Sequence, residues 1–199
     1  MLPPMWGTDT AISIALGVGL AAAVGFRVFV PLLIASIAAY TGHLHLDEGF
    51  AWLGSASAIL MLSVAATVEV LAYYIPAVDN LLDTVTTPLA LVAGVVVSAA
   101  VITDLPPWIK WGTAVIAGGG VAAVTQGVTA MVRAKSTAFT AGLGNPLIST
   151  AELLAATGIA AVALLAPLVA VALVVVLCWL TVHLVRKFLR HRSSGHDTP

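Results

Sequence analysis

The chain has 199 residues, of which 60% are apolar and 9% are charged, whereas a soluble domain averages about 25% charged residues. Too few polar side chains remain to cover a water-facing surface, so this composition, with a mean hydropathy of +1.08, indicates a membrane protein. The net charge of −1 excludes the long basic face that a nucleic-acid partner would need. The single cysteine, Cys178, excludes an intrachain disulfide and gives no support to a cysteine-based metal site.

Six apolar runs are each interpreted as one crossing, for which a helix needs ~20 residues. The N-terminus has no positively charged region followed by a cleavage site, so the first run is expected to remain as a span. The last apolar stretch would form a helix of about 58 Å against a bilayer core of about 30 Å, so it is divided at Pro167. The predicted spans are 11–40, 55–75, 87–102, 112–132, 148–165 and 168–185.

A shorter segment lies between the second and third spans. Its apolar residues fall at positions 78, 81, 82 and 85, the spacing of one helical face, and Asp79 and Asp83 lie off this face. This spacing predicts a short re-entrant or interfacial helix. The predicted fold class is therefore all-α: a polytopic transmembrane helix bundle of about six spans, with one domain over residues 1–189 and a disordered basic and polar tail over 190–199. Five spans with one re-entrant hairpin are the alternative.

The placement of lysine and arginine predicts the orientation, because cytoplasmic loops carry an excess of both. Arg133 and Lys135 follow the fourth span, and four further basic residues open the tail: Arg186, Lys187, Arg190 and Arg192. The loops assigned to the outside hold only Lys110. We therefore expect both termini in the cytoplasm.

Two similar segments suggest an internal repeat. GVGLAAAVG begins at Gly17, GGGVAAVTQ begins at Gly118, and each precedes an arginine. Six spans divide into three plus three of opposite orientation, and such inverted repeats are typical of transporters. Chance similarity between alanine-rich segments is the alternative.

The most expensive residue of the first span is Arg27, since an unpaired charge at the bilayer centre costs from about +3 to over +10 kcal/mol. Gly25 and Pro31 weaken the helix on either side of it. We predict a broken helix over 25–31, with backbone dipoles around a site near the midplane. The alternative is a kinked helix with a structural ion pair, for which Glu69 and Glu152 are the only carboxylates within predicted spans.

Six charged residues are expected to share one depth near the cytoplasmic side: Glu69, Asp79, Asp83, Arg133, Lys135 and Glu152. The predicted substrate or ion pathway consists of Arg27, Glu69, Asp79, Asp83, Gln126, Asn145 and Glu152. An interfacial ion-pair network is the alternative, and simple snorkelling is favoured for Arg133 and Lys135.

The stretch from Gly142 to Glu152, GLGNPLISTAE, predicts a helix that starts at Pro146 with Asn145 as its N-cap. Free backbone N–H groups at such a start can bind an anion, and an ordinary helix start is the alternative. HLHLDE, from His43 to Glu48, has metal-type ligands in an isolated exposed loop, so we expect no metal and no other cofactor. No nucleophile or nucleotide motif appears, and an enzyme is not expected.

GFRVFVP in the first span, EVLAYYIPAVDNLLDTV from Glu69 and GLGNPLISTAE together resemble a bacterial membrane family, the domain of unknown function 4126. Pro76, Asp79 and Asp83 form the most specific part of the resemblance, which covers about residues 12–189. It implies a polytopic protein of the bacterial plasma (inner) membrane and carries no catalytic role over to any residue.

Together these patterns predict a small transporter, permease or lipid-translocating protein. Its partners would be the lipid bilayer and a small ion, a polar solute or a lipid headgroup. The alternative is a structural or accessory membrane protein that scaffolds a partner complex, as a homo-oligomer or with another membrane protein. Transport requires the ionisable groups to converge, whereas scaffolding requires only that they be satisfied and that a groove of small residues be exposed.

Overall fold

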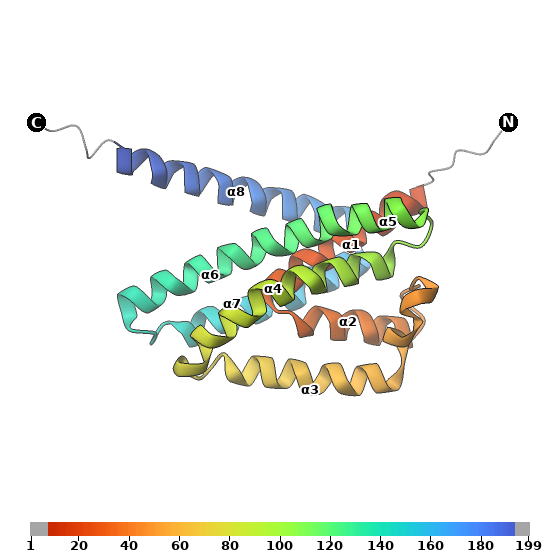
Figure 1. Ribbon diagram of the computed structural model, residues 1–199, viewed down its shortest axis with the longest axis horizontal. Helices are drawn as coiled ribbons and strands as arrows, with labels where there is room; N and C mark the ends of the chain where they lie inside the picture. Colours follow the sequence, from red (N-terminus) through yellow and green to blue (C-terminus); the bar gives the residue numbers. More distant parts are fainter. Residues whose placement is uncertain (1–7, 194–199) are drawn as a thin grey trace, which may run out of the picture.

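The computed structural model describes residues 8–193, without the side chains of residues 8, 76–77, 79–81, 83, 181–182 and 184–193. The described chain consists of helices joined by loops and contains no strand, as the predicted all-α class requires (Figure 1). Its elements are α1 (Thr8–Phe26), α2 (Phe29–Tyr40), the 3₁₀ helix η1 (Glu48–Gly54), α3 (Ala56–Ala72), α4 (Pro76–Val101), α5 (Pro107–Thr113), the π-helical turn η2 (Ala114–Gly119), α6 (Gly120–Thr140), α7 (Asn145–Leu165) and α8 (Pro167–Ser193).

The first apolar run is broken, as the sequence predicted, but it is not a single crossing. α1 ends at Phe26 and α2 begins at Phe29, and between them the chain reverses, so that α2 runs back beside α3 (Figure 1). Pro31 lies in the first turn of α2, where its missing N–H leaves no intrahelical bond unmade. Residues 11–40 therefore form a helical hairpin with Arg27 at its tip.

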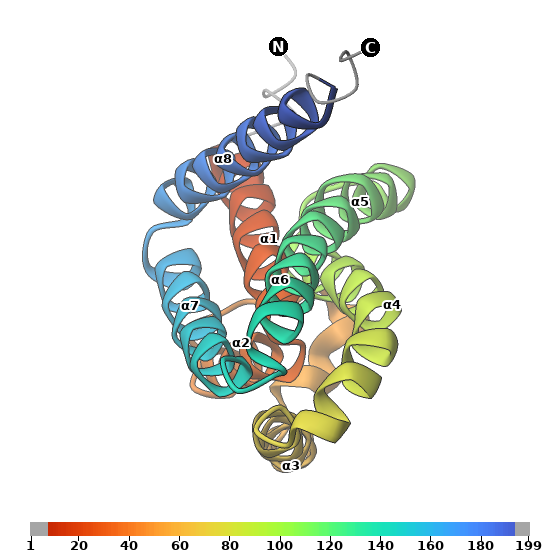
Figure 2. The ribbon, with the colours of Figure 1, turned by 90° about the vertical axis from the view of Figure 1, so that its left-hand side faces the viewer.

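α1 lies at the centre of the bundle and packs against α4, α6, α7 and α8 (Figure 2). Small residues allow this close packing: a Cβ at Gly25 would lie 2.5 Å from the Thr125 Cβ, and one at Gly19 would lie 2.8 Å from the Ala163 Cβ. Close approach through small residues is the usual way in which membrane helices associate, because lipid provides no hydrophobic drive between them.

The segment 78–85 does not form a separate short helix, which corrects the prediction. It forms the first turns of α4, which continues through Pro88 to Val101. Proline is tolerated inside membrane helices because neighbouring groups can satisfy the freed carbonyl, so Pro88 does not end the helix. α8 likewise continues to Ser193, so residues 190–193 of the expected disordered tail are helical, while 194–199 lie outside the described residues.

Within residues 8–193, four helical segments are long and apolar enough to cross a membrane, which makes this a membrane protein. They are Asp9–Phe26, Thr84–Val101, Pro107–Thr140 and Asn145–Leu165. The pair Glu48–Gly54 and Ala56–Ala72, bent by 66°, adds a fifth, and Phe29–Tyr40 and Pro167–Leu180 are shorter apolar helices. Six spans is therefore an approximate number.

The hairpin also changes the topology. α1 begins at the end of the bundle where α2 finishes, whereas α8 finishes at the opposite end (Figure 1). Because the reversal at Arg27 adds one change of direction, the two ends of the described chain lie at opposite ends of the bundle. This geometry favours opposite sides of the membrane for the two ends over the predicted common side, and the orientation of the termini stays a prediction.

A polar contact closes the end where α2 finishes. The Lys110 ammonium lies 2.8 Å from Asp47 Oδ2, and the Asp47 N–H donates to the Ala100 carbonyl at 2.8 Å. The hydrogen bond from Lys110 holds the pKa of the Asp47 carboxyl below its ordinary value. The loop after α2 is thus tied to both α4 and α5.

Candidate functional site: a buried polar cluster at the tip of the α1–α2 hairpin

Ionisable side chains converge around the break between α1 and α2. We define the polar cluster as six residues from the break, α3, α6 and α7, each at most 5% exposed: Arg27, Glu69, Tyr73, Arg133, Ser149 and Glu152. It holds two arginines and two glutamates, so it is neutral when all four are ionised. Such a concentration of buried charge is rare inside a membrane bundle and is by default a candidate site.

Glu69 holds the start of α2. The Val28 N–H donates to its Oε1 at 2.7 Å, and the Phe29 N–H donates to its Oε2 at 3.1 Å. The N-cap residue of α2, Val28, has no side chain that can accept these bonds. A carboxylate from α3 therefore takes the place of an N-cap and also complements the positive end of the helix dipole.

Glu152 forms a two-point ion pair with Arg133. The Arg133 Nε donates to Glu152 Oε1 at 3.0 Å, and its Nη2 donates to Oε2. This paired geometry is the strong form of an arginine–carboxylate interaction. Arg27 Nη2 lies 3.6 Å from the same Oε2, so one carboxylate serves two arginines.

Arg27 has few hydrogen bonds for a buried guanidinium. Its Nη2 donates to the Ser149 carbonyl oxygen at 3.0 Å and to the Ser149 Oγ. Its Nε and Nη1 are buried and have no hydrogen-bond partner among the residues that the structure describes. The Tyr73 ring supports both arginines, since its centroid is 4.0 Å from the Arg27 Cζ and 3.9 Å from the Arg133 Cζ.

A second set of polar groups extends the cluster along the bundle. The Tyr73 hydroxyl is 3.0 Å from the Thr86 Oγ1, to which Gln126 Nε2 donates at 3.3 Å. Gln126 is thus linked to the cluster, as the predicted pathway requires. Asn145 is buried, but it is not the N-cap of α7: it is the first helical residue, and its Nδ2 donates to the Thr137 Oγ1 at 3.1 Å. Its side chain faces α6, so the predicted N-cap and the anion site based on it are not formed.

Three of the predicted pathway residues come together: Arg27, Glu69 and Glu152. Asp79 and Asp83 lie in the first turns of α4, and their side chains are outside the described residues. Arg133 was expected to snorkel and is instead 3% exposed, whereas Lys135 is exposed as expected.

Tyr73 and Ser149 were missed by the sequence analysis. Tyr73 lies four residues after Glu69, and Ser149 lies three residues before Glu152. These spacings place each on the same helix face as its glutamate, which is the signal that could have found them.

In the part of the chain with described side chains, no three His, Cys, Asp or Glu residues converge in a way that could hold a metal ion. In the HLHLDE loop, the His43 Nδ1 is 3.0 Å from the Thr41 Oγ1, and Asp47 binds Lys110.

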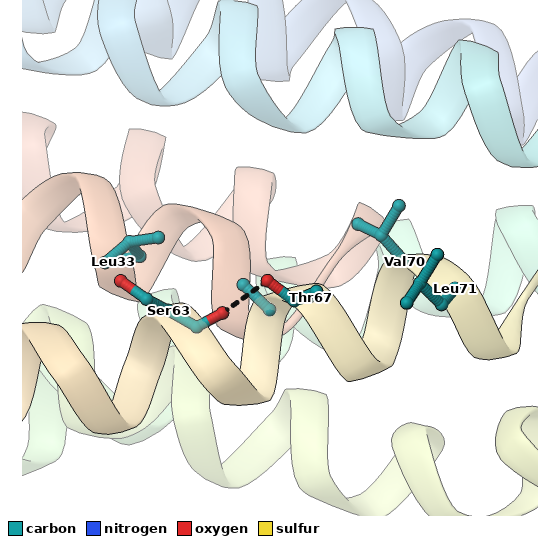
Figure 3. Close-up of a pocket in the computed structure, with 6 residues that line it drawn as sticks. Leu33, Ser63, Thr67, Val70 and Leu71 are labelled. Carbon is teal, nitrogen blue, oxygen red and sulfur yellow. Dashed lines mark hydrogen bonds between the residues drawn. The ribbon is translucent and has the colours of Figure 1, made fainter.

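An apolar groove lies on the outside of the bundle, beside α2 and α3 (Figure 3). Small and apolar side chains line it: Leu33, Ser63, Ala66, Thr67, Val70 and Leu71. The Thr67 hydroxyl donates to the Ser63 carbonyl at 2.7 Å, so this polar group is satisfied within its own helix.

A family model described as a domain of unknown function (DUF4126) matches residues 14–187, which include every helix of the bundle at least in part. Comparisons with curated proteins and with solved structures find no match.

Proposed function

We propose that this chain, which belongs to the family of the domain of unknown function 4126, is a transporter or permease that moves a small ion, a polar solute or a lipid headgroup past the polar cluster. The bilayer is its permanent partner. No catalytic step is part of the proposal, because the cluster pairs its ionisable groups with one another and not with a nucleophile.

The observation that carries the proposal is the convergence of four ionisable side chains from separate segments on a helix break. Burying a charge costs several kcal/mol per ion. Replacing a buried ion pair with well-packed apolar residues is often neutral or stabilises the protein by roughly 1–4 kcal/mol. A network that served stability alone would therefore have a cheaper alternative. Broken helices with polar sites inside the bundle are the usual binding devices of transporters.

The capping of α2 by Glu69 supplies an element that can move. The start of α2 is held by the side chain of another helix, because Val28 and Phe29 donate to a carboxylate on α3. Protonation or displacement of that carboxylate would release the tip of the hairpin. Such a change at the tip is the step that we assign to solute passage.

In the orientation that we propose, the protein lies in a plasma (inner) membrane. The end of the bundle that is nearer to the polar cluster faces the cytoplasm. The C-terminal part of α6, which carries Arg133 and Lys135, and that of α8, which carries the four basic residues, lie toward this end, whereas α5, which carries Lys110, lies at the other end (Figure 1). The inverted repeat of three plus three spans stays a prediction.

Flux through Glu69→Gln protein tests the proposal. The wild type, reconstituted in vesicles, is screened by solid-supported-membrane recording with a panel of inorganic cations, inorganic anions and small organic acids. We expect a current with at least one member, and we expect Glu69→Gln to abolish it, since the amide keeps the shape of the carboxylate but not its charge. Glu48→Gln is the matched control because Glu48 is exposed at the start of η1.

Loss of current in Glu69→Gln counts only if the variant still elutes as a folded, monodisperse species. No current from the wild type with any solute of the panel, or full current in Glu69→Gln, would contradict the transport proposal.

The groove beside α3 favours a second candidate, a scaffold for a membrane partner or for a second copy of the chain. Ser63, Ala66 and Thr67 provide a surface that another helix can approach closely. Cross-linking in native membranes distinguishes the two functions. A cross-link through a cysteine at position 67 that Ala66→Leu removes, together with an absence of flux, would favour the scaffold.

A further inference from the structure

Arg27 is the cluster residue whose binding capacity is least used. A guanidinium has five N–H donors, and the two bonds to Ser149 come from Nη2 alone. Nε and Nη1 have no partner in the described part of the chain, although the residue is only 1% exposed. Buried donors almost always find an acceptor in native proteins, so an acceptor other than a described protein group belongs beside Arg27.

The two carboxylates of the cluster are both engaged elsewhere. Glu69 accepts from the backbone of α2, and Glu152 is bound at both oxygens by Arg133. Arg27 reaches Glu152 only at 3.6 Å, beyond hydrogen-bonding distance. Although the cluster is neutral in total, Arg27 shares its nearest carboxylate among the described side chains with Arg133.

We infer that the polar cluster binds a small oxyanion, of carboxylate or phosphate type, through Arg27 Nε and Nη1. This inference rests on the proposed function and names the substrate class of that site. An oxyanion presents several acceptor oxygens and one negative charge, which are the two things that Arg27 lacks. The Ser149 hydroxyl, already beside the guanidinium, has a proton that it can donate to the same ligand.

A free oxyanion and the phosphate of a lipid headgroup share this chemistry. A cation is disfavoured, because the unused groups are donors of a positively charged side chain. Ordered water is the competing occupant, since it also supplies acceptors. If water alone binds Arg27, no signal of the protein will change saturably when an oxyanion is added.

The titration uses the wild-type protein, and a conservative variant serves only to assign the signal. The protein is labelled with 15N-arginine, and the Nε–H signals are recorded during titration with inorganic phosphate, with acetate and, as an ionic-strength control, with sodium chloride. We expect one Nε–H signal to shift saturably with phosphate or acetate and not with chloride. The signal is assigned by its loss in Arg27→Lys.

Calorimetry with Arg27→Gln gives a second readout. We expect the affinity for the same oxyanion to fall at least tenfold, and Lys135→Gln, which removes an exposed positive charge, to bind like the wild type. If Arg27→Gln does not fold, the labelled wild type still decides.

Nanodiscs separate the two sources of the oxyanion. A shift with inorganic phosphate in phosphatidylcholine discs supports a free ligand, and a shift that requires phosphatidylglycerol supports a headgroup. No saturable shift in any arm would overturn the inference. Flux of a cation alone would support the transport proposal and contradict the oxyanion inference. Binding of an oxyanion that depends on Arg27, without any flux, would support the oxyanion inference and contradict the transport proposal.

Discussion

Glu152→Gln is the most demanding perturbation of the polar cluster, because this carboxylate contacts two arginines. The change removes the charge from a group bound at both oxygens by Arg133 and lying 3.6 Å from Arg27 Nη2. The glutamine keeps one acceptor oxygen, but its amide places donor hydrogens against a guanidinium. Of the cluster's own carboxylates, only Glu69 then remains beside the two arginines, and the cluster changes from neutral to a net charge of +1.

The size of the effect follows from these contacts. Removing one partner of a buried ion pair costs about 3–5 kcal/mol. The separation of 3.6 Å between Glu152 and Arg27 corresponds to a further attraction of about 4–5 kcal/mol at an effective dielectric constant of ~20. The nearby carboxylate of Glu69 offsets part of the loss of this attraction. We therefore expect Glu152→Gln to lower the free energy of unfolding by at least about 3 kcal/mol.

A double-mutant cycle with Arg133→Gln identifies the cause. The double variant retains Arg27 and Glu69 and is neutral again, so it should be more stable than the sum of the single changes by about 0.5–3 kcal/mol. Denaturant unfolding in bicelles measures each free energy of unfolding, with Glu48→Gln as the exposed control. A Glu152→Gln protein within about 1 kcal/mol of the wild type, or strictly additive single changes, would refute an ionised, mutually dependent cluster.

Three other predictions concern the rest of the bundle. Gly25→Ala should destabilise it by about 1–3 kcal/mol through overpacking, since the new Cβ would lie 2.5 Å from the Thr125 Cβ and 2.6 Å from the Ala122 oxygen. The control is Gly127→Ala, whose new Cβ would have nothing within 4 Å and which should be neutral or stabilising in the same unfolding assay. The Asp47–Lys110 contact lowers the Asp47 pKa below its ordinary 3.8. The contact should stabilise the folded protein by at most about 1 kcal/mol at this partly exposed site. This stabilisation should be complete above the ordinary pKa and lost as the pH falls through the lower pKa of the folded state. Unfolding measured against pH should therefore show this loss in the wild type and not in Asp47→Asn. Finally, cysteines placed at Asp9 and His45 in a Cys178→Ala background should be labelled from one membrane face and a cysteine at Lys135 from the other; labelling of Asp9 and Lys135 positions from the same face would contradict the hairpin.

The break in the first apolar run was predictable, whereas the reversal was not. Gly25 and Pro31 weaken the helix through their own backbones, and this effect can be read locally. Whether the chain continues or turns back depends on Glu69, which is 41 residues after Val28 in the chain and holds the start of α2. A contact of this range leaves no periodic pattern in the segment whose direction it determines.

The members of the site were also easier to predict than their pairing. Arg27, Glu69 and Glu152 stand out because a charge inside an apolar run is costly. Arg133 does not, because a basic residue near the end of a span can reach the interface at little cost. Its burial depends on the rotation of α6 toward α7, which places its guanidinium on Glu152. A helix pattern with wide apolar faces on several sides does not determine that rotation.

The reversal at the hairpin tip and the unused hydrogen-bond donors of Arg27 have one common cause. Because α2 starts at Phe29 without a capping side chain of its own, its first N–H groups require an external acceptor, and Glu69 supplies it. That bond withdraws from Arg27 one of the two carboxylates of the cluster, and Arg133 withdraws most of the other. A straight helix through this region would satisfy its own N–H groups and leave Glu69 free to pair with Arg27. The broken geometry is therefore what leaves a buried guanidinium with unused donors, and an acceptor that enters the cluster stabilises the broken form over the straight one.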